Sequence, residues 1–316
     1  MKALPLRRKT LLKDKHITVP LIPECSACIM NSLQILIPLL AERKEDQMTL
    51  FKFAYQKIAE GYEKKLEPLI LSVDLYQRLY ERAKIYDPYR EIKERSIEAA
   101  ETALPLIEES VESYEGYEKL RAALAASIAG NLIDFNTAYH TPDLDSLVEV
   151  YKSILEIGFA LDDSNHLWRR LKSQKGHIVF LADNAGETLF DIPLLRLFRD
   201  LEWRTTFVVK EEAMINDATW SDVAGSEIES LCKIVDTGGW AHGVPRRWVS
   251  QGFLDLVASC DLVISKGQAN VESFPEIQRE IGVETYYVIR AKCPHIASSL
   301  GAIIGDNVVL RRPYVE

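Results

Sequence analysis

The sequence contains no apolar run of the roughly 20 residues that a membrane-spanning helix needs. Its basic N-terminal segment, residues 1–16, also lacks the continuous apolar core of a secretory signal. These absences predict a cytoplasmic protein with no membrane partner. Cysteine is scarce as well, and an odd count of 5 in a chain of 316 residues argues against a disulfide-bonded scaffold.

Positive charge is in deficit, because 38 Lys and Arg residues face 47 Asp and Glu residues, for a formal net charge of -9. Nucleic acids recruit basic surfaces, so we expect no nucleic-acid partner. A small anionic ligand stays compatible with this balance, since it needs only a few cations placed locally.

Several nucleotide and hydrolase motifs are missing. There is no GxxxxGK motif followed by Ser or Thr, which disfavours a phosphate loop, and no GxGxxG after the first strand of the alternating half, which disfavours dinucleotide binding. The GxSxG elbow of α/β-hydrolases and the HExxH helix of zinc proteases are absent too.

The chain changes character near residue 172. Before it, apolar residues recur three and four positions apart, which predicts an all-α N-terminal domain over residues 1–172. After it, β-branched runs alternate with amphipathic helices, which predicts an α/β domain over residues 173–316. Its fold class is a Rossmann-like parallel sheet with helices on both faces. The expected strands are residues 177–183, 204–210, 231–236, 261–266 and 285–290, with a short last strand at 308–310.

Each of the first five strands ends in a charged residue. Parallel strands bring their carboxyl ends to one edge of a sheet, where ligands bind, so we expect these side chains to converge on a shared metal and anion site. The five residues are Asp183, Lys210, Asp236, Lys266 and Arg290.

Two short segments carry oxygen ligands for a hard cation. Asp183 and Asn184 follow the first strand, with Glu187 at the start of the next helix, and Asp217 follows the second strand. Two carboxylates and an amide oxygen suit Mg²⁺, Mn²⁺ or a similar divalent ion. Alternatively, Asp217 is an ordinary N-cap for a helix near Ser221.

Lys266 and Gly267 end the fourth strand, where an ammonium group and backbone amides can face one anion. The alternative is a turn glycine beside a solvated lysine. Cys25, Cys28 and Cys293 form a second candidate cluster for metal binding or redox chemistry, with His295 as a fourth ligand. An incidental group of cysteines is the alternative there.

Taken together, these motifs resemble the damage-control phosphatase family, formerly domain of unknown function 89, whose eukaryotic members were also described as acidic-residue methyltransferases. The pairs Cys25–Cys28 and Lys292–Cys293 resemble its prokaryotic subgroup. The other matching segments are Gly130–Phe135, Asp183–Asn184 with Gly186–Glu187, Asn216–Thr219, and Lys266–Gly267 with Asn270.

The resemblance implies a helical domain on a Rossmann-like domain, and a metal-dependent phosphatase acting on small phosphorylated metabolites such as sugar phosphates. It implies a divalent metal (Mg, Mn, Co or Ni) on Asp183, Asn184 and Asp217. Lys266 and Asn270 would contact phosphate or substrate, and Glu187 would orient water or a sugar hydroxyl. Asn131 and Asp134 would approach the same cleft from the helical half.

Two other functions stay open. One is a carboxyl methyltransferase that uses S-adenosylmethionine, although the loop after the first strand is not glycine-rich and Asp183–Asn184 suits a metal better. The other is a non-enzymatic metal- or redox-binding protein built on the three cysteines. The choice between attack by water and attack by Asp183 is open as well.

Overall fold

The computed structural model describes residues 17, 19–131 and 144–313. It confirms the α/β class, since helices surround one seven-stranded sheet with the order β1-β7-β6-β5-β2-β3-β4. Neighbouring strands are parallel except β6 and β7. The strands are β1 (Leu161–Asp162), β2 (His177–Leu181), β3 (Arg204–Val209), β4 (Lys233–Asp236), β5 (Leu262–Lys266), β6 (Thr285–Arg290) and β7 (Asn307–Arg312).

The sheet differs from the sequence prediction at one edge. The last strand, β7, runs antiparallel to β6, and it also pairs with β1, which lies before residue 172. β1 has only two residues, too few to produce a detectable alternation of apolar and polar positions. The predicted parallel sheet is therefore confirmed from β4 to β6 and wrong at β7.

Both faces of the sheet are covered by helices, as predicted. Along β2, Ile178 and Phe180 join one hydrophobic cluster, whereas Val179 and Leu181 join the other. Successive side chains of a strand point to opposite faces, so an unbroken apolar strand is what a sheet buried on both sides requires. The first face packs on helices α5 (Gly116–Gly130) and α8 (Ile192–Asp200). The second packs on α11 (Gln251–Ala258), α12 (Gln268–Ile281) and α13 (Pro294–Leu300).

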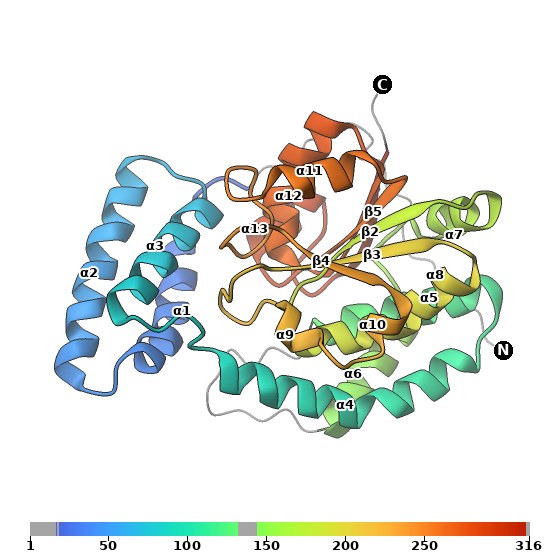
Figure 1. Cartoon of the computed structure of the whole chain (residues 1–316), viewed down its shortest axis with the longest axis horizontal. Coiled ribbons are helices and arrows are strands. Elements are labelled where there is room, and N and C mark those ends of the chain that lie inside the picture. The colour runs from blue at the N-terminus through green and yellow to red at the C-terminus, as the bar shows by residue number, and fades with distance from the viewer. Residues whose placement is uncertain (1–16, 18, 132–143, 314–316) are drawn as a thin grey trace.

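The first three helices form a lobe beside the sheet, coloured blue to cyan in Figure 1. They are α1 (Glu24–Leu40), α2 (Lys44–Glu63) and α3 (Pro68–Ala83). The next helices run along the sheet (Figure 1): α4 (Arg90–Glu112), α5 (Gly116–Gly130), α6 (Leu144–Ile157) and α7 (Ser164–Ser173). One hydrophobic cluster holds side chains from this half and from the strands. The domain division at residue 172 stays a prediction.

The remaining helices alternate with strands. They are the 3₁₀ helix η1 (Gly186–Asp191), α8 (Ile192–Asp200), α9 (Trp220–Val223), α10 (Ile228–Leu231), α11 (Gln251–Ala258), α12 (Gln268–Ile281) and α13 (Pro294–Leu300).

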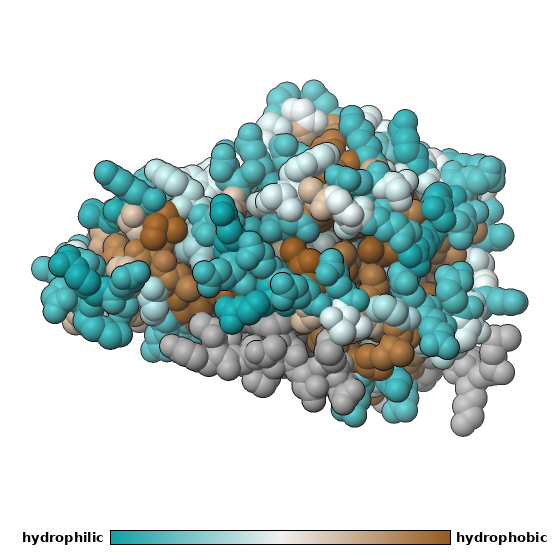
Figure 2. All heavy atoms as spheres, turned by 60° about the horizontal axis from the view of Figure 1, so that its bottom comes forward, coloured by the Kyte–Doolittle hydropathy of each residue, from teal (hydrophilic) through white to brown (hydrophobic). Residues whose placement is uncertain are grey.

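The surface is mainly polar on the face that Figure 2 shows, with apolar areas interrupted by hydrophilic side chains. Exposed large apolar side chains are spread over several elements, among them Met48 on α2 and Leu106 on α4. Of the helices within the described residues, none combines the length and the apolar character that crossing a bilayer would require.

Candidate active site at the carboxyl ends of the strands

The candidate site lies where the order of the strands reverses. β2 is central: the chain adds β3 and β4 on one side of it and β5 to β7 on the other. In open α/β sheets the carboxyl ends of the strands at such a reversal form the usual ligand-binding crevice. Asp183 follows β2 at this point, and Lys266 ends the neighbouring β5.

Main-chain bonds join the two loops that carry the predicted metal ligands. Asn184 and Asp217 form an antiparallel bridge. The amide of Ala218 donates to the Asp183 carbonyl at 2.8 Å, and the amide of Ala185 donates to the Asn216 carbonyl at 3.0 Å. The fold therefore brings Asp183, Asn184 and Asp217 together although they lie on separate loops.

A side-chain network fixes the carboxylates of Asp183 and Glu187. The amide nitrogen of Asn131 donates to Asp183 Oδ2 at 2.8 Å and to Glu187 Oε2 at 2.9 Å. The amide nitrogen of Asn184 donates to the same two oxygens at 3.1 Å and 3.0 Å. The helical half thus reaches the site through Asn131, at the end of α5. Asp134 lies outside the described residues.

Glycine is required beside Asp183. Gly267 has a φ of +77°, and a Cβ on it would lie 2.0 Å from the Asp183 carboxyl carbon. The left-handed backbone and the close approach both exclude a side chain. The sequence pattern of a lysine followed by glycine is thus explained by room for Asp183 as much as by anion binding.

The two aspartates lie in a site whose negative charge is only partly compensated by nearby lysines. Burial raises the pKa of Asp183 well above its usual range, and the charges of Glu187 and Asp217 raise it further. Burial also raises the pKa of Asp217 to about 6, although the Lys210 ammonium opposes the shift. A cation bound between the two carboxylates would relieve this repulsion.

The donor set suits a hard divalent cation. The amide oxygen of Asn131 is buried and has no hydrogen-bond partner within the described ranges. Together with the carboxylates of Asp183 and Asp217 and the amide oxygen of Asn184, it completes an all-oxygen set of the kind that Mg²⁺ and Mn²⁺ bind. The described residues contain no group of three or more His, Cys, Asp or Glu side chains placed to hold a metal, so amide oxygens would have to contribute.

Lys266 lies in the interior, where protein oxygens occupy its ammonium group. Its Nζ donates to Glu187 Oε1 at 2.7 Å, to Asp191 Oδ1 at 2.9 Å and to the Ser127 carbonyl at 2.9 Å. An ammonium has three N–H donors, so all three are used. Lys266 is fully buried, and this geometry joins β5 to η1 and α5 rather than presenting a cation to a ligand.

Asn270 is also an internal connector. Its amide nitrogen donates to the carbonyls of Ala182 and Lys266, at 3.1 Å and 2.6 Å. Its amide oxygen accepts from Lys210 Nζ at 3.5 Å, and the same Nζ lies 3.6 Å from Asp217 Oδ2. Asn270 therefore ties the ends of β2 and β5 together, and Lys210 supports Asp217.

Only three of the five charged strand ends converge. Asp236 is exposed and accepts from the Gly238 amide at 2.8 Å, as a turn residue does. Arg290 donates to the Asn307 side chain across β6 and β7 at 3.4 Å. The expectation that all five meet is wrong for these two, because β4 and β6 lie farther from the reversal point.

Asp217 is not a helix cap, so the alternative interpretation of this residue is wrong. Thr219 is the N-cap of α9 and forms a capping box with Asp222. Asp217 is instead buried, and it accepts from the Gly243 amide at 3.4 Å.

A cavity of about 570 Å³ opens beside the aspartates. Its lining includes Asn131, Asp183, Asn184 and Asp217, together with residues of α1 and α3. Glu187, Lys266 and Asn270 are not among its described lining residues. The helical lobe therefore supplies one wall of the cavity and the sheet edge supplies the other.

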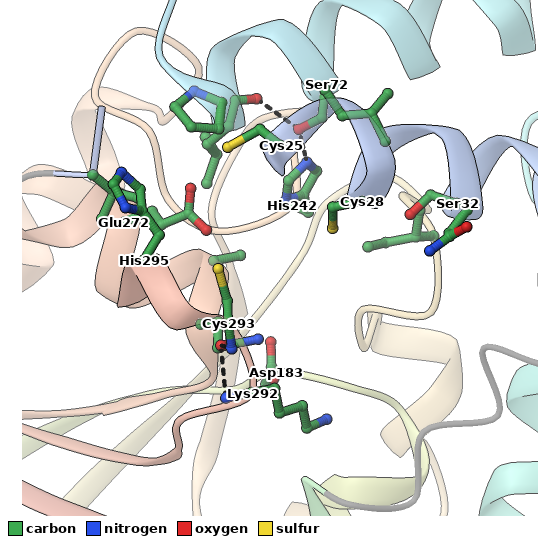
Figure 3. Close-up of a pocket in the computed structure, with 18 of the residues that line it drawn as sticks. Cys25, Cys28, Ser32, Ser72, Asp183, His242, Glu272, Lys292, Cys293 and His295 are labelled. Atoms are coloured by element: carbon green, nitrogen blue, oxygen red, sulfur yellow. Dashed lines mark hydrogen bonds between the residues drawn. The ribbon is translucent and has the colours of Figure 1, made fainter. Parts of the chain in front are cut away.

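The three cysteines line the same cavity. Cys25 and Cys28 come from α1 and Cys293 precedes α13, as Figure 3 shows. None of the three forms a disulfide within the described residues, and burial raises the pKa of Cys25. The suggested fourth ligand, His295, has its Nε2 atom 2.7 Å from the Pro20 carbonyl. Their metal or redox role stays a prediction.

The sequence prediction missed several residues near the site. Lys292 lines the cavity, and its charge lowers the pKa of Asp183 against the larger raising effects. Asp191 and Ser127 hold Lys266, and His242 lines the cavity beside Gly243. The sequence identified Lys292 only as part of a family element, without a role at the site, and nothing in the sequence singled out Asp191, Ser127 or His242.

Known proteins resemble the whole chain. An uncharacterized protein of Methanocaldococcus jannaschii is 31% identical over 96% of this chain and 99% of its own length. Damage-control phosphatases of Pyrococcus horikoshii and Archaeoglobus fulgidus are 29% and 26% identical, over 92% and 90% of this chain and 98% and 97% of their own. A crystal structure of a DUF89 family protein from P. horikoshii superimposes with a TM-score of 0.81 at 27% identity, covering 93% of this chain and 99% of that one.

A family model described as the damage-control phosphatase ARMT1-like domain matches residues 21–308. That range includes β1 to β6, Asn131, both aspartates and the cysteine elements. The chain therefore belongs to the damage-control phosphatase ARMT1-like family, as its motifs predicted.

Proposed function

We propose that this protein is a metal-dependent phosphatase that hydrolyses phosphate monoesters of small metabolites such as sugar phosphates. The observation that carries the proposal is the pair of buried carboxylates, Asp183 and Asp217, on joined loops at the edge of a cavity of about 570 Å³. Family membership supports it, because two relatives are named damage-control phosphatases.

Asp183, Asn184 and Asp217 would hold the divalent cation, and the buried oxygen of Asn131 adds a fourth ligand. When bound, the cation would neutralise phosphate charge and lower the pKa of a water molecule. The protein's part is rigidity: the bridge between the two loops fixes the carboxylates before substrate arrives. Such preorganisation avoids a cost at the moment of reaction.

Glu187 and Lys266 would act on the site from the interior. Lys266 binds Glu187 Oε1, while Asn131 and Asn184 bind Glu187 Oε2. Glu187 thus orients the amide groups of both asparagines, which turns their oxygens away from it. In this proposal Lys266 is a positioning residue, and the predicted contact between Lys266 and phosphate is replaced by Lys292.

Lys292 would face the phosphate oxygens from the cavity wall. It is half-buried, and its charge acts on Asp183. Its backbone amide donates to Gln268 Oε1 at 3.1 Å, which anchors the loop to the start of α12. A fixed cation at that place stabilises charge on a transferring phosphoryl group.

Two routes of attack fit the site: a water molecule, or the Asp183 carboxylate as a nucleophile. Asp183 Oδ2 already accepts two amide hydrogen bonds, which leaves Oδ1 for either role. Rapid acid quenching followed by mass spectrometry separates the routes, since a phosphoaspartate at Asp183 would exclude direct attack by water.

No observation favours the two other functions, methyl transfer from S-adenosylmethionine and non-enzymatic metal or redox binding. A cytoplasmic location and the absence of a nucleic-acid partner remain predictions from the sequence. The small phosphorylated metabolite is the one partner that the proposal requires.

The test is phosphate release from a panel of phosphate monoesters by protein stripped with a chelator and reloaded with Mg²⁺, Mn²⁺, Co²⁺ or Ni²⁺. We expect release only with metal. Asp217→Asn should reduce it by roughly 100-fold or more, because it removes a ligand charge and a preorganised group.

Asp236→Asn is the matched control, because Asp236 also ends a strand but lies exposed in a turn. It should keep wild-type activity. Equal activity of Asp217→Asn and Asp236→Asn would remove Asp217 from the ligand set, and metal-independent release by the stripped protein would refute the proposal.

A further inference from the structure

A polar pair in the cavity has no part in the mechanism above. Ser72 of α3 and His242, in the loop between β4 and α11, are 170 positions apart, yet Ser72 Oγ and His242 Nε2 lie 2.9 Å apart. Both are buried, with 8% and 9% of their surface exposed, and both line the cavity. Figure 3 shows the pair on one side of the cavity and Asp183 on the other.

The hydrogen bonds of Ser72 define the tautomer of His242. Ser72 Oγ also lies 3.0 Å from the Leu69 carbonyl, which can only accept. A hydroxyl has a single proton, so both contacts form together only if Ser72 donates to Leu69 and accepts from His242 Nε2–H. The proton of a neutral imidazole is then on Nε2, and Nδ1 has a lone pair.

The imidazole stays neutral in this setting. Burial lowers the pKa of His242 to about 3, and the charge of Lys210 adds to the shift. Across the described residues no side chain or backbone group bonds Nδ1, and this atom is not shut off from the cavity. The Tyr76 ring, centred 6.1 Å away, packs beside the imidazole.

The loop of His242 is coupled to the metal-binding end. The next residue, Gly243, donates its amide to Asp217 Oδ2 at 3.4 Å, and the amide of Val244 donates to Ser273 Oγ of α12 at 2.8 Å. His242 is therefore held at a fixed place relative to Asp217, and it lines the same cavity.

We propose that His242 Nδ1 accepts a hydrogen bond from a hydroxyl group on the organic part of the substrate, so that the enzyme selects hydroxylated phosphate monoesters over their deoxy counterparts. This inference rests on the proposed phosphatase function and names the residue that sets its specificity. Ser72 is the positioning residue, because it fixes the tautomer.

The expected discrimination follows from the cost of an unpaired acceptor. A deoxy substrate displaces water from Nδ1 without replacing its hydrogen bond, and such losses reduce kcat/KM by about tenfold or more. A substrate with an acceptor in place of the hydroxyl would place its own lone pair against that of Nδ1. Two acceptors cannot form a hydrogen bond, so this substrate would be rejected as well.

The experiment compares kcat/KM for matched pairs: glycerol 1-phosphate against propyl phosphate, and glucose 6-phosphate against 2-deoxyglucose 6-phosphate. The wild type should favour the hydroxylated member of at least one pair by about tenfold. His242→Leu should bring that ratio near one without abolishing turnover of the deoxy member. His242→Asn, which keeps an acceptor close to the Nδ1 position, should retain part of the preference, and Ser72→Ala should reduce it.

The second readout does not depend on turnover. In protein with ¹⁵N-labelled histidine, we expect two-bond correlations to show His242 protonated at Nε2. The Nδ1 signal should move on addition of glycerol 1-phosphate and stay in place with propyl phosphate.

The outcomes separate the two proposals. Ratios near one in the wild type, ratios unchanged in His242→Leu, or a proton on Nδ1 would overturn the role of His242 while phosphate release continued. Absence of phosphate release with every metal and substrate would end the phosphatase proposal, and the NMR titration would still decide whether Nδ1 receives a hydroxyl.

Discussion

The acidic centre has two sides whose chemistry differs. On the interior side, Lys266 pairs with both Glu187 and Asp191, at 2.7 Å and 2.9 Å, and every ammonium proton has an acceptor. On the cavity side, Asp183 and Asp217 are buried carboxylates with raised pKa values. The same residue types thus serve as structure on one side and as candidate chemistry on the other. The difference lies in access: the Lys266 cluster is closed inside the fold, whereas Asp183 and Asp217 line the cavity.

This contrast teaches how to tell the two roles apart. A buried charge with its full set of partners is stable as it stands, whereas a buried carboxylate without a matching cation costs free energy until a ligand arrives. Removal of a residue from the interior side should therefore destabilise the fold, and removal from the cavity side should reduce activity.

The largest effect should come from Lys266→Met. It leaves the buried carboxylates of Glu187 and Asp191 without their cation, and breaking such a pair costs about 3–5 kcal/mol. Urea unfolding followed by circular dichroism measures the loss. An unfolding free energy within about 1 kcal/mol of the wild type would contradict the structural role.

Lys292→Met should act in the opposite way. Lys292 is only half-buried, so its loss should change the free energy of unfolding by no more than about 0.5 kcal/mol. Phosphate release should fall by about 100-fold, because one preorganised charge is lost. Lys292→Arg is the matched control and should retain part of the activity. Unimpaired release by Lys292→Met would move the phosphate contact elsewhere.

The smallest effect should be a pH dependence of the metal-free protein. The pKa of Asp217 rises from 3.8 to about 6 on folding, so the folded state binds more protons than the unfolded state between these values. Stability should therefore fall as pH rises from about 4 to about 6, by roughly 1–2 kcal/mol.

Urea unfolding at a series of pH values, with chelator and with Mg²⁺, measures this slope. Asp217→Asn should reduce the slope in chelator, and Mg²⁺ should reduce it in the wild type by holding Asp183 and Asp217 ionised. Asp191, whose pKa burial also raises to about 6, should keep part of the slope in both cases. Stability that rises with pH in the chelated wild type would contradict this prediction, because it would show that nearby cations already balance the charges of the two aspartates.

Much of the fold was accessible from the sequence. The runs of β-branched and apolar residues in β2, β3 and β5 predicted a sheet covered on both faces, because such strands have no face for water. β1 was not accessible, since two residues give no period. The antiparallel direction of β7 was not accessible either, because a strand's direction depends on how the chain returns to the sheet edge.

The candidate site divides in the same way. Asp183, Asn184 and Asp217 could be picked out because oxygen-bearing residues follow strands at one sheet edge. Asn131 was picked out only by the family resemblance. Asp191 and His242 come from elements whose sequences are typical of an ordinary helix or loop. Their places depend on how α5, η1 and the loop after β4 pack, which no local pattern records.

The sequence by itself determined the α/β class, the family and the residue types gathered at the strand ends, because these follow from periodicity and short motifs. Only the tertiary structure decided which charges are matched. It placed Lys266 against Glu187 and Asp191, left Asp183 and Asp217 beside the cavity, and set His242 against Ser72. The physical reason is that charge compensation and tautomer depend on distances of a few ångströms between residues far apart in the chain.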